Sequence, residues 1–283
     1  MAVLPNEFTK QNQFLVCVDS DGCAMDTMNV KHFEFFGPIA ADVFGIENKE
    51  AFQEDWNRVN LFSSTRGVNR FTALVMCLDD AAAAGESIMN IDALRDWANS
   101  ATSLSNASLK EAIEANEEPS LVTALDWSNK VNEGIHTELT GRDEPFPGAK
   151  AGLEKLAEAG DVAIVSSANS EALQSEWTRH DLMPSVDVIY GQEAGSKADA
   201  IADLLKHGYA KDEILMVGDA PGDLKAAQTN GVLYYPILFG NEEFSWDRLR
   251  NEALAKFNNK EYAGEYQDKV IGEFQDLLAK YDA

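Results

Sequence analysis

Length, composition and charge limit what this chain can be. With 283 residues, of which 45% are hydrophobic and 25% charged, it is expected to fold as a globular protein with a substantial core and one or two domains. The formal net charge of −25 argues against binding to nucleic acids or anionic membranes, because either partner requires a cationic surface.

The cysteines and the amino-terminal segment indicate which class of protein to expect. Cys17, Cys23 and Cys77 show no Cys-x-x-Cys spacing, and only four histidines accompany them. This pattern indicates buried thiols rather than disulfides or a zinc site. The amino terminus lacks the regions of a signal peptide, and no stretch approaches the roughly 18 apolar residues of a membrane span. We therefore expect a soluble, cytoplasmic protein without membrane contact.

The first predicted element is a buried strand that ends in two carboxylates. Residues 14–18 form an uninterrupted apolar run, and Asp19 and Asp21 follow it directly. Such a run suits a parallel strand covered on both faces, and open parallel sheets collect their chemistry beyond the carboxyl ends of the strands. Because side chains two apart on a strand share a face, both carboxylates are expected to point at one substrate. The alternative is a solvated turn after an ordinary strand.

The segment between Thr27 and about Arg142 predicts helices rather than sheet. It contains an alanine-rich stretch at 78–84, and its apolar residues recur at helical spacing. We expect an inserted helical domain here. The recurring residues are Phe71, Leu74, Val75, Leu78, Ile91, Leu94, Trp97, Ala98, Leu109, Ile113, Leu121 and Leu125.

Two more apolar strands and a lysine follow the insertion. Residues 161–165 run into Ser166, and residues 214–218 run into Asp219 and, across a Pro-Gly turn, Asp223. Lys197 stands just before a helical pattern at 198–206. Taken singly, Ser166 and Lys197 are typical of ordinary surface positions. Three strands that each end in a suitable polar group indicate a common site.

The carboxyl-terminal segment is expected to pack helices on the core. Apolar and aromatic residues recur at helical spacing among charges from Phe244 onward. An alternative for three aromatic residues near the last strand is that they border the pocket. The stripe is Tyr266, Val270, Phe274, Leu277 and Tyr281, and the three alternative residues are Tyr234, Tyr235 and Trp246.

Other ligand-binding motifs do not fit. A calcium loop starting at Asp19 needs glycine at its sixth position and glutamate at its twelfth, where Ala24 and Val30 stand. The segment 191–197 lacks the glycine that a phosphate loop places directly before its lysine, since Ser196 is there. No Gly-x-Gly-x-x-Gly follows a strand.

The ordered set of strand-end residues resembles the haloacid dehalogenase superfamily of phosphohydrolases. Its four motifs fall on Asp19 and Asp21, on Ser166, on Lys197, and on Gly218 with Asp219 and Asp223, and the resemblance covers about 13–26 and 143–240. It implies a Rossmann-like, doubly wound α/β core with an inserted helical cap that selects the substrate. The core would comprise 1–26 and 143–283, with a helical extension from about 241, and the cap 27–142.

The resemblance also implies a chemistry that depends on Mg²⁺. Asp19 would attack phosphorus, Asp21 would act as acid and base, and Ser166 and Lys197 would stabilise the transferring group. Carboxylates and phosphate oxygens are the ligands that Mg²⁺ favours. The metal ligands would be Asp19, Asp21 through its backbone carbonyl, Asp219 and Asp223.

Further residues are expected to contact the substrate. Gly67-Val-Asn-Arg70 resembles the Gly-x-x-Arg substrate loop of capped sugar-phosphate phosphatases and β-phosphoglucomutase. Arg66, Asn69 and Arg70 would meet its distal polar or anionic group, and Ser167 would bind substrate beside Ser166. The alternative for Arg70 is a helix cap or a salt bridge.

Several functions remain open from the sequence. The leading hypothesis is a phosphatase acting on a small phosphorylated metabolite, and a phosphosugar mutase with the same residues comes second. A dehalogenase is disfavoured because it needs neither a metal nor the acid Asp21. A non-catalytic binding protein is disfavoured because clustered carboxylates repel one another without a metal. The sequence leaves the oligomeric state open.

Overall fold

The protein divides into two compact units, which we describe separately. The structure is a computed structural model that describes residues 2–139 and 141–282. Unit 1 comprises Met1–Thr27 and Asp143–Lys280, and unit 2 comprises Met28–Arg142 and Tyr281–Ala283. The predicted core and cap ranges remain a prediction, because compactness does not test whether each part folds independently. No helix in the described part of the chain has the length and apolarity to cross a membrane.

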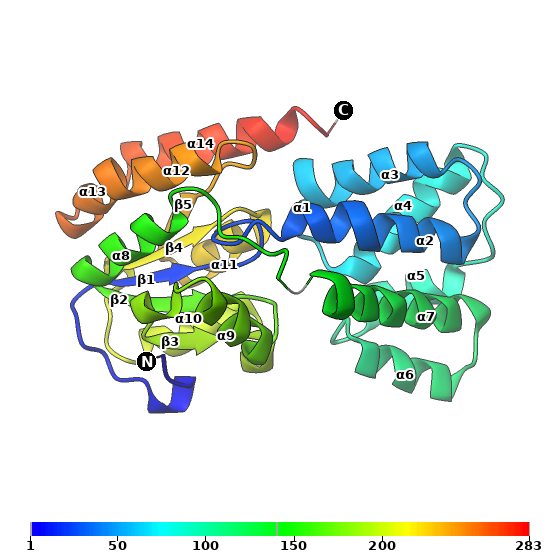
Figure 1. Cartoon of the computed structure of the whole chain (residues 1–283), viewed down its shortest axis with the longest axis horizontal. Coiled ribbons are helices and arrows are strands. Elements are labelled where there is room, and N and C mark those ends of the chain that lie inside the picture. Colours follow the sequence, from blue (N-terminus) through cyan, green and yellow to red (C-terminus); the bar gives the residue numbers. More distant parts are fainter. Residues whose placement is uncertain (1, 140, 283) are drawn as a thin grey trace. The chain divides into compact units, whose positions relative to one another are not determined.

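Unit 1 is built on a five-stranded parallel sheet with the strand order β3-β2-β1-β4-β5 (Figure 1). The central strand β1 is buried along its whole length, as its uninterrupted apolar sequence predicts. The strands are β1 (Leu15–Val18), β2 (Asp161–Val165), β3 (Val188–Tyr190), β4 (Ile214–Gly218) and β5 (Leu233–Pro236).

Helices lie on both sides of this sheet (Figure 1). Alternate residues of β1, Val16 and Val18, join one large cluster of buried side chains with residues from the helices. The predicted fold class, a doubly wound α/β core with a helical insertion, is confirmed. The helices of unit 1 are α8 (Ala149–Ala159), α9 (Ser170–Arg179), α10 (Lys197–Leu205), α11 (Pro221–Asn230), α12 (Glu242–Arg248), α13 (Leu254–Asn258) and α14 (Glu265–Ala279).

Unit 2 is helical throughout its described regular structure and has its own core. Trp56 and Trp127 pack edge to face with ring centroids 5.9 Å apart, and Trp127 donates its indole N–H to the carbonyl oxygen of Phe36 over 3.1 Å. The helices are α1 (Met28–Val30), α2 (Gly37–Phe44), α3 (Lys49–Asn57), α4 (Arg70–Ala83), α5 (Asp92–Ser100), α6 (Asn106–Ala115) and α7 (Pro119–Gly134).

The carboxyl-terminal helices α12, α13 and α14 belong to unit 1. In the predicted stripe, Val270 and Phe274 are buried, but Leu278 is buried in place of Leu277, and Tyr281 is 42% exposed. Val270, Phe274 and Leu278 are spaced four residues apart, so they lie on one face of α14.

The pocket alternative for the aromatic residues near β5 is wrong. Tyr234, Tyr235 and Trp246 are all buried in the core of unit 1. The Tyr234 hydroxyl donates to the carbonyl oxygen of Gly218, and the Tyr235 hydroxyl donates to that of Ser245. These polar groups have partners inside the protein, so the aromatic rings serve the core. The three cysteines are buried free thiols, as predicted.

Candidate active site

Strands β1 and β4 bring two aspartates to the same edge of the sheet. In their parallel register Val18 lies opposite Val217, and the backbone N–H of Asp19 donates to the carbonyl oxygen of Val217 over 3.0 Å. Asp19 therefore lies opposite Gly218, and Asp219 follows one residue later on the neighbouring strand. Their positions follow from the apolar runs, which end where the carboxylates begin.

The third carboxylate comes from the first turn of α11. Pro221 begins this helix, and the Asp223 carboxylate accepts the backbone N–H of Ala220 over 3.0 Å. Gly218 makes room for the side chain, because a Cβ at position 218 would lie 2.3 Å from Cγ of Asp223. The Gly-Asp-x-x-x-Asp spacing thus places both of its carboxylates at the end of β4.

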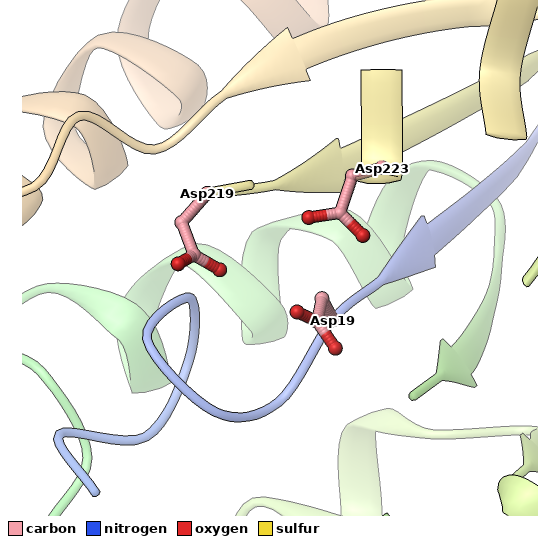
Figure 2. A group of neighbouring side chains, drawn as sticks. All are labelled: Asp19, Asp219 and Asp223. Carbon is pink, nitrogen blue, oxygen red and sulfur yellow. The ribbon is translucent and has the colours of Figure 1, made fainter. Parts of the chain in front are cut away.

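The three carboxyl groups face a shared space beyond β1 and β4 (Figure 2). Asp19, Asp219 and Asp223 are 5%, 1% and 0% exposed, and one oxygen from each lies within 4.8 Å of the others. Nζ of Lys197, at the start of α10, lies 2.9 Å from an Asp19 oxygen and 2.5 Å from an Asp223 oxygen. The predicted lysine thus joins two of the three clustered aspartates.

Burial shapes the electrostatics of this cluster. It raises the pKa of Asp19 to about 8, with Lys197 acting against the rise and Asp223 and Asp219 adding to it. Burial disfavours the charged form of Lys197 as well, yet Asp19 and Asp223 hold the pKa of this amine above its usual range. Lys197 supplies one positive charge against three carboxyl groups, so an additional cation would favour the ionised form of all three.

Magnesium fits the residues present. It is a hard ion that binds carboxylate oxygens and keeps further positions for water or phosphate oxygens. Asp19, Asp219 and Asp223 supply three such oxygens within one short span. The buried negative charge of this donor set is what a divalent cation would neutralise.

Asp21 lies in the loop after β1 and not on the strand. The strand ends at Val18, so the argument that Asp19 and Asp21 share a strand face is wrong. Backbone N–H groups of the loop bond back to the Ser20 carbonyl oxygen and turn the chain away from the extended direction. The Asp21 side chain is partly exposed and accepts a hydrogen bond from the hydroxyl of Thr27.

Sequence reasoning missed Thr27. Its hydroxyl is fully buried and holds the carboxylate of Asp21, six residues earlier. A single threonine after a loop carries no periodic or motif signal, so only the folded loop reveals this contact.

The two candidate serines follow β2, the neighbour of β1 in the sheet. Ser166 is 5% exposed, and its hydroxyl oxygen accepts the backbone N–H of Ala168 over 3.3 Å. Ser167 is exposed. Ser166 lies one residue beyond β2, at the sheet edge to which β1 also delivers Asp19. The substrate roles of both serines stay predictions.

The three candidate residues in unit 2 make contacts within that unit. Arg66 is 4% exposed and donates to the carbonyl oxygen of Leu61. Asn69 caps α4 by accepting the backbone N–H of Phe71 over 2.9 Å. Arg70 donates to Asn132 over 2.7 Å, and its guanidinium lies 4.9 Å from the ring centroid of Phe36. Each thus has a structural function, and their contact with substrate stays a prediction.

This chain is similar to solved structures at low sequence identity. A predicted phosphoglycolate phosphatase from Haemophilus somnus is 16% identical with a TM-score of 0.49, over 80% of this chain and 86% of that protein. A hydrolase from Pseudomonas syringae is 18% identical with a TM-score of 0.45, over 84% and 90%. Both TM-scores lie below 0.5, so neither likeness carries an argument about this chain.

The family assignment rests on the sequence. No curated protein matches this chain. The family model described as haloacid dehalogenase-like hydrolase matches residues 91–235, just over half of the chain. The matched range contains Ser166, Lys197, Asp219 and Asp223, and Asp19 precedes it. The chain therefore belongs to the haloacid dehalogenase-like hydrolases.

Proposed function

We propose that this protein is a magnesium-dependent phosphatase that hydrolyses a small phosphorylated metabolite through an aspartyl-phosphate intermediate. The observation that carries the proposal is the buried cluster of Asp19, Asp219 and Asp223 with Lys197 between two of them. A phosphate monoester is a dianion, and a carboxylate can approach it only where cations offset the repulsion.

In the first step, an oxygen of Asp19 bonds to phosphorus while the bond from phosphorus to the leaving oxygen breaks. Asp21 gives its proton to that oxygen, so the alcohol leaves neutral. In the second step, Asp21 takes a proton from water, and the water oxygen bonds to phosphorus as the bond to Asp19 breaks. Inorganic phosphate is released, and both aspartates return to their starting states.

Two side chains, one cationic and one neutral, would stabilise the phosphoryl group in both steps. Lys197 offers positive charge to the phosphoryl oxygens, and Ser166 can donate its hydroxyl hydrogen to one of them. A magnesium ion held by Asp19, Asp219, Asp223 and the backbone carbonyl of Asp21 would neutralise charge on the nucleophile and the phosphate. Ser167 would bind the substrate beside Ser166.

Selectivity is assigned to the helical unit 2. We propose that it acts as a cap and that Arg66, Asn69 and Arg70 recognise the part of the substrate away from the phosphate. Arginine suits this role because its planar group of donors matches carboxylate and phosphate oxygens. The net charge of −25 gives no long-range attraction for an anion, so local cations must capture it. A cytoplasmic location is part of this proposal.

The test is release of inorganic phosphate from sugar phosphates, phosphoglycolate and an aryl phosphate. Asp19→Asn is expected to abolish turnover, since an amide is not a nucleophile, and excess chelator is expected to abolish it in the natural protein. Asp276→Asn, at an exposed position on α14, is the control and is expected to retain activity. Turnover that survives both Asp19→Asn and chelator would overturn the proposal. Isomerised sugar phosphate without net phosphate release would assign a mutase instead.

A further inference from the structure

The loop that carries Asp21 is a tight turn gathered around one oxygen atom. The carbonyl oxygen of Ser20 accepts backbone N–H groups from Cys23, Ala24 and Met25 over 3.2, 2.9 and 2.9 Å. Gly22 supplies the positive φ of +81° that the turn requires. Asp21 lies inside this turn, so the conformation of the loop backbone determines where the Asp21 carboxyl group lies.

Two buried tryptophans hold the loop from outside. Nε1 of Trp177, on α9, donates to the Ser20 hydroxyl oxygen over 2.9 Å. Nε1 of Trp246, on α12, donates to the Cys23 carbonyl oxygen over 3.0 Å. Both side chains are 0% exposed, so these bonds are shielded from water. The two contacts fall on either side of Asp21 in the sequence.

Trp246 is itself fixed by helix α8. A Cβ at Gly152 would lie 2.4 Å from Cε3 of Trp246, and one at Gly148 would lie 3.1 Å from its Cβ. The indole therefore fills space left by two glycines and has little freedom to shift. Trp246 also lies beyond residue 235, where the family match ends. The carboxyl-terminal extension thus reaches the active-site loop directly.

We infer that Trp177 and Trp246 are positioning residues, which hold the loop 20–25 so that Asp21 can exchange a proton with the leaving oxygen and with water. The inference rests on the proposed function. An indole has one N–H donor, and a phenylalanine in its place leaves the Cys23 carbonyl oxygen without it. The loop then gains alternative arrangements, in which the Asp21 carboxyl group is misplaced.

The first test compares Trp246→Phe with Trp127→Phe. Both changes remove a buried indole N–H that donates to a backbone carbonyl, but Trp127 lies in the core of unit 2 and its partner is Phe36. We expect Trp246→Phe to lower kcat about tenfold with KM changed less than about twofold, because proton transfer depends on geometry. Trp127→Phe should keep kcat. Equal kcat in Trp246→Phe and the natural protein, or an equal loss in both variants, overturns the inference.

Ser20→Ala provides a second test of the inference, and this change does not create a large cavity. It removes the acceptor of the Trp177 indole, so Ser20→Ala and Trp177→Phe should each lower kcat, and the double variant should lose little more than either alone. Fully additive losses of kcat would show that Ser20 and Trp177 do not act through their shared hydrogen bond. This result would overturn the role inferred for Trp177.

A readout independent of turnover separates the inference from the proposed function. Cys23 lies on the loop and is 0% exposed, whereas the buried thiols of Cys17 and Cys77 lie on β1 and α4. Alkylation followed by peptide mass spectrometry should show Cys23 reacting about tenfold faster in Trp246→Phe, with Cys17 and Cys77 unchanged. Uniform acceleration, or none, overturns the inference. Absence of phosphate release from the natural protein would overturn the proposed function, while the alkylation result would still report on the loop.

Discussion

At the scale of single residues, Asp223 reaches the site because residue 218 has no side chain. A Cβ at position 218 would lie 2.3 to 2.5 Å from atoms of the Asp223 side chain, far inside van der Waals contact. Because Asp223 is fully buried and bonded to Ala220 and Lys197, it has no free space to retreat into. The glycine of the Gly-Asp-x-x-x-Asp spacing is therefore a requirement of packing around a carboxylate.

Gly218→Ala is accordingly expected to weaken magnesium binding. The added methyl group displaces the Asp223 carboxylate, and we expect at least about a tenfold loss of affinity, as for other disturbed metal surroundings. Titration calorimetry with MgCl₂ measures it. The control is Gly222→Ala on α11, where a Cβ meets nothing within 4 Å. If Gly218→Ala bound Mg²⁺ with unchanged affinity, Asp223 would not be a ligand of the metal.

At the scale of elements, the start of α4 shows how one residue can carry two roles. Asn69 caps this helix and also donates its side-chain N–H to the carbonyl oxygen of Leu104 over 3.1 Å. The cap satisfies a backbone N–H that the first turn leaves without a partner. A substrate role for Asn69 must therefore be separated from this helix-capping role.

Asn69→Ala is expected to lower the free energy of unfolding by about 1 kcal/mol through loss of the cap. Asn69→Asp keeps an acceptor for the Phe71 N–H and should retain most of the stability. Urea unfolding followed by circular dichroism compares the variants. If Asn69→Ala unfolds like the natural protein but has a raised KM for the best substrate, the residue acts on substrate rather than on α4.

At the scale of the whole molecule, Glu213 ties together distant parts of unit 1. Its carboxylate accepts hydrogen bonds from the Ala210 backbone N–H and the Gln13 side chain over 3.0 and 2.9 Å, and Nζ of Lys260 lies 3.3 Å away. These partners lie before β4, before β1 and after α13. The Ala210 bond, followed by those from Gln13 and Lys260, lowers the pKa of Glu213 from its ordinary value of 4.5 to about 2.

This lowered pKa predicts a pH-dependent contribution to stability. The contribution is fully present above about pH 4.5 and is lost as the pH falls toward 2, because the unfolded chain takes up the proton first. Glu213→Gln should therefore cost about 1 kcal/mol at pH 7 and progressively less below pH 4.5. Urea unfolding across pH 3 to 7 measures this, with Glu261→Gln at an exposed position as control. A cost that does not change with pH would exclude the charge as its cause.

The sequence by itself determined three of the five strands of the sheet, β1, β2 and β4, together with the helical insertion and the identity of the clustered carboxylates. These features have local causes: apolar runs that end in aspartate, and apolar residues at helical spacing. The tertiary structure decided which side chains meet. Lys197 joins Asp19 and Asp223, Thr27 holds Asp21, and Trp246 bonds to the carbonyl of Cys23, 223 positions earlier. Such contacts arise from packing between elements that are distant in sequence, so no local sequence pattern predicts them.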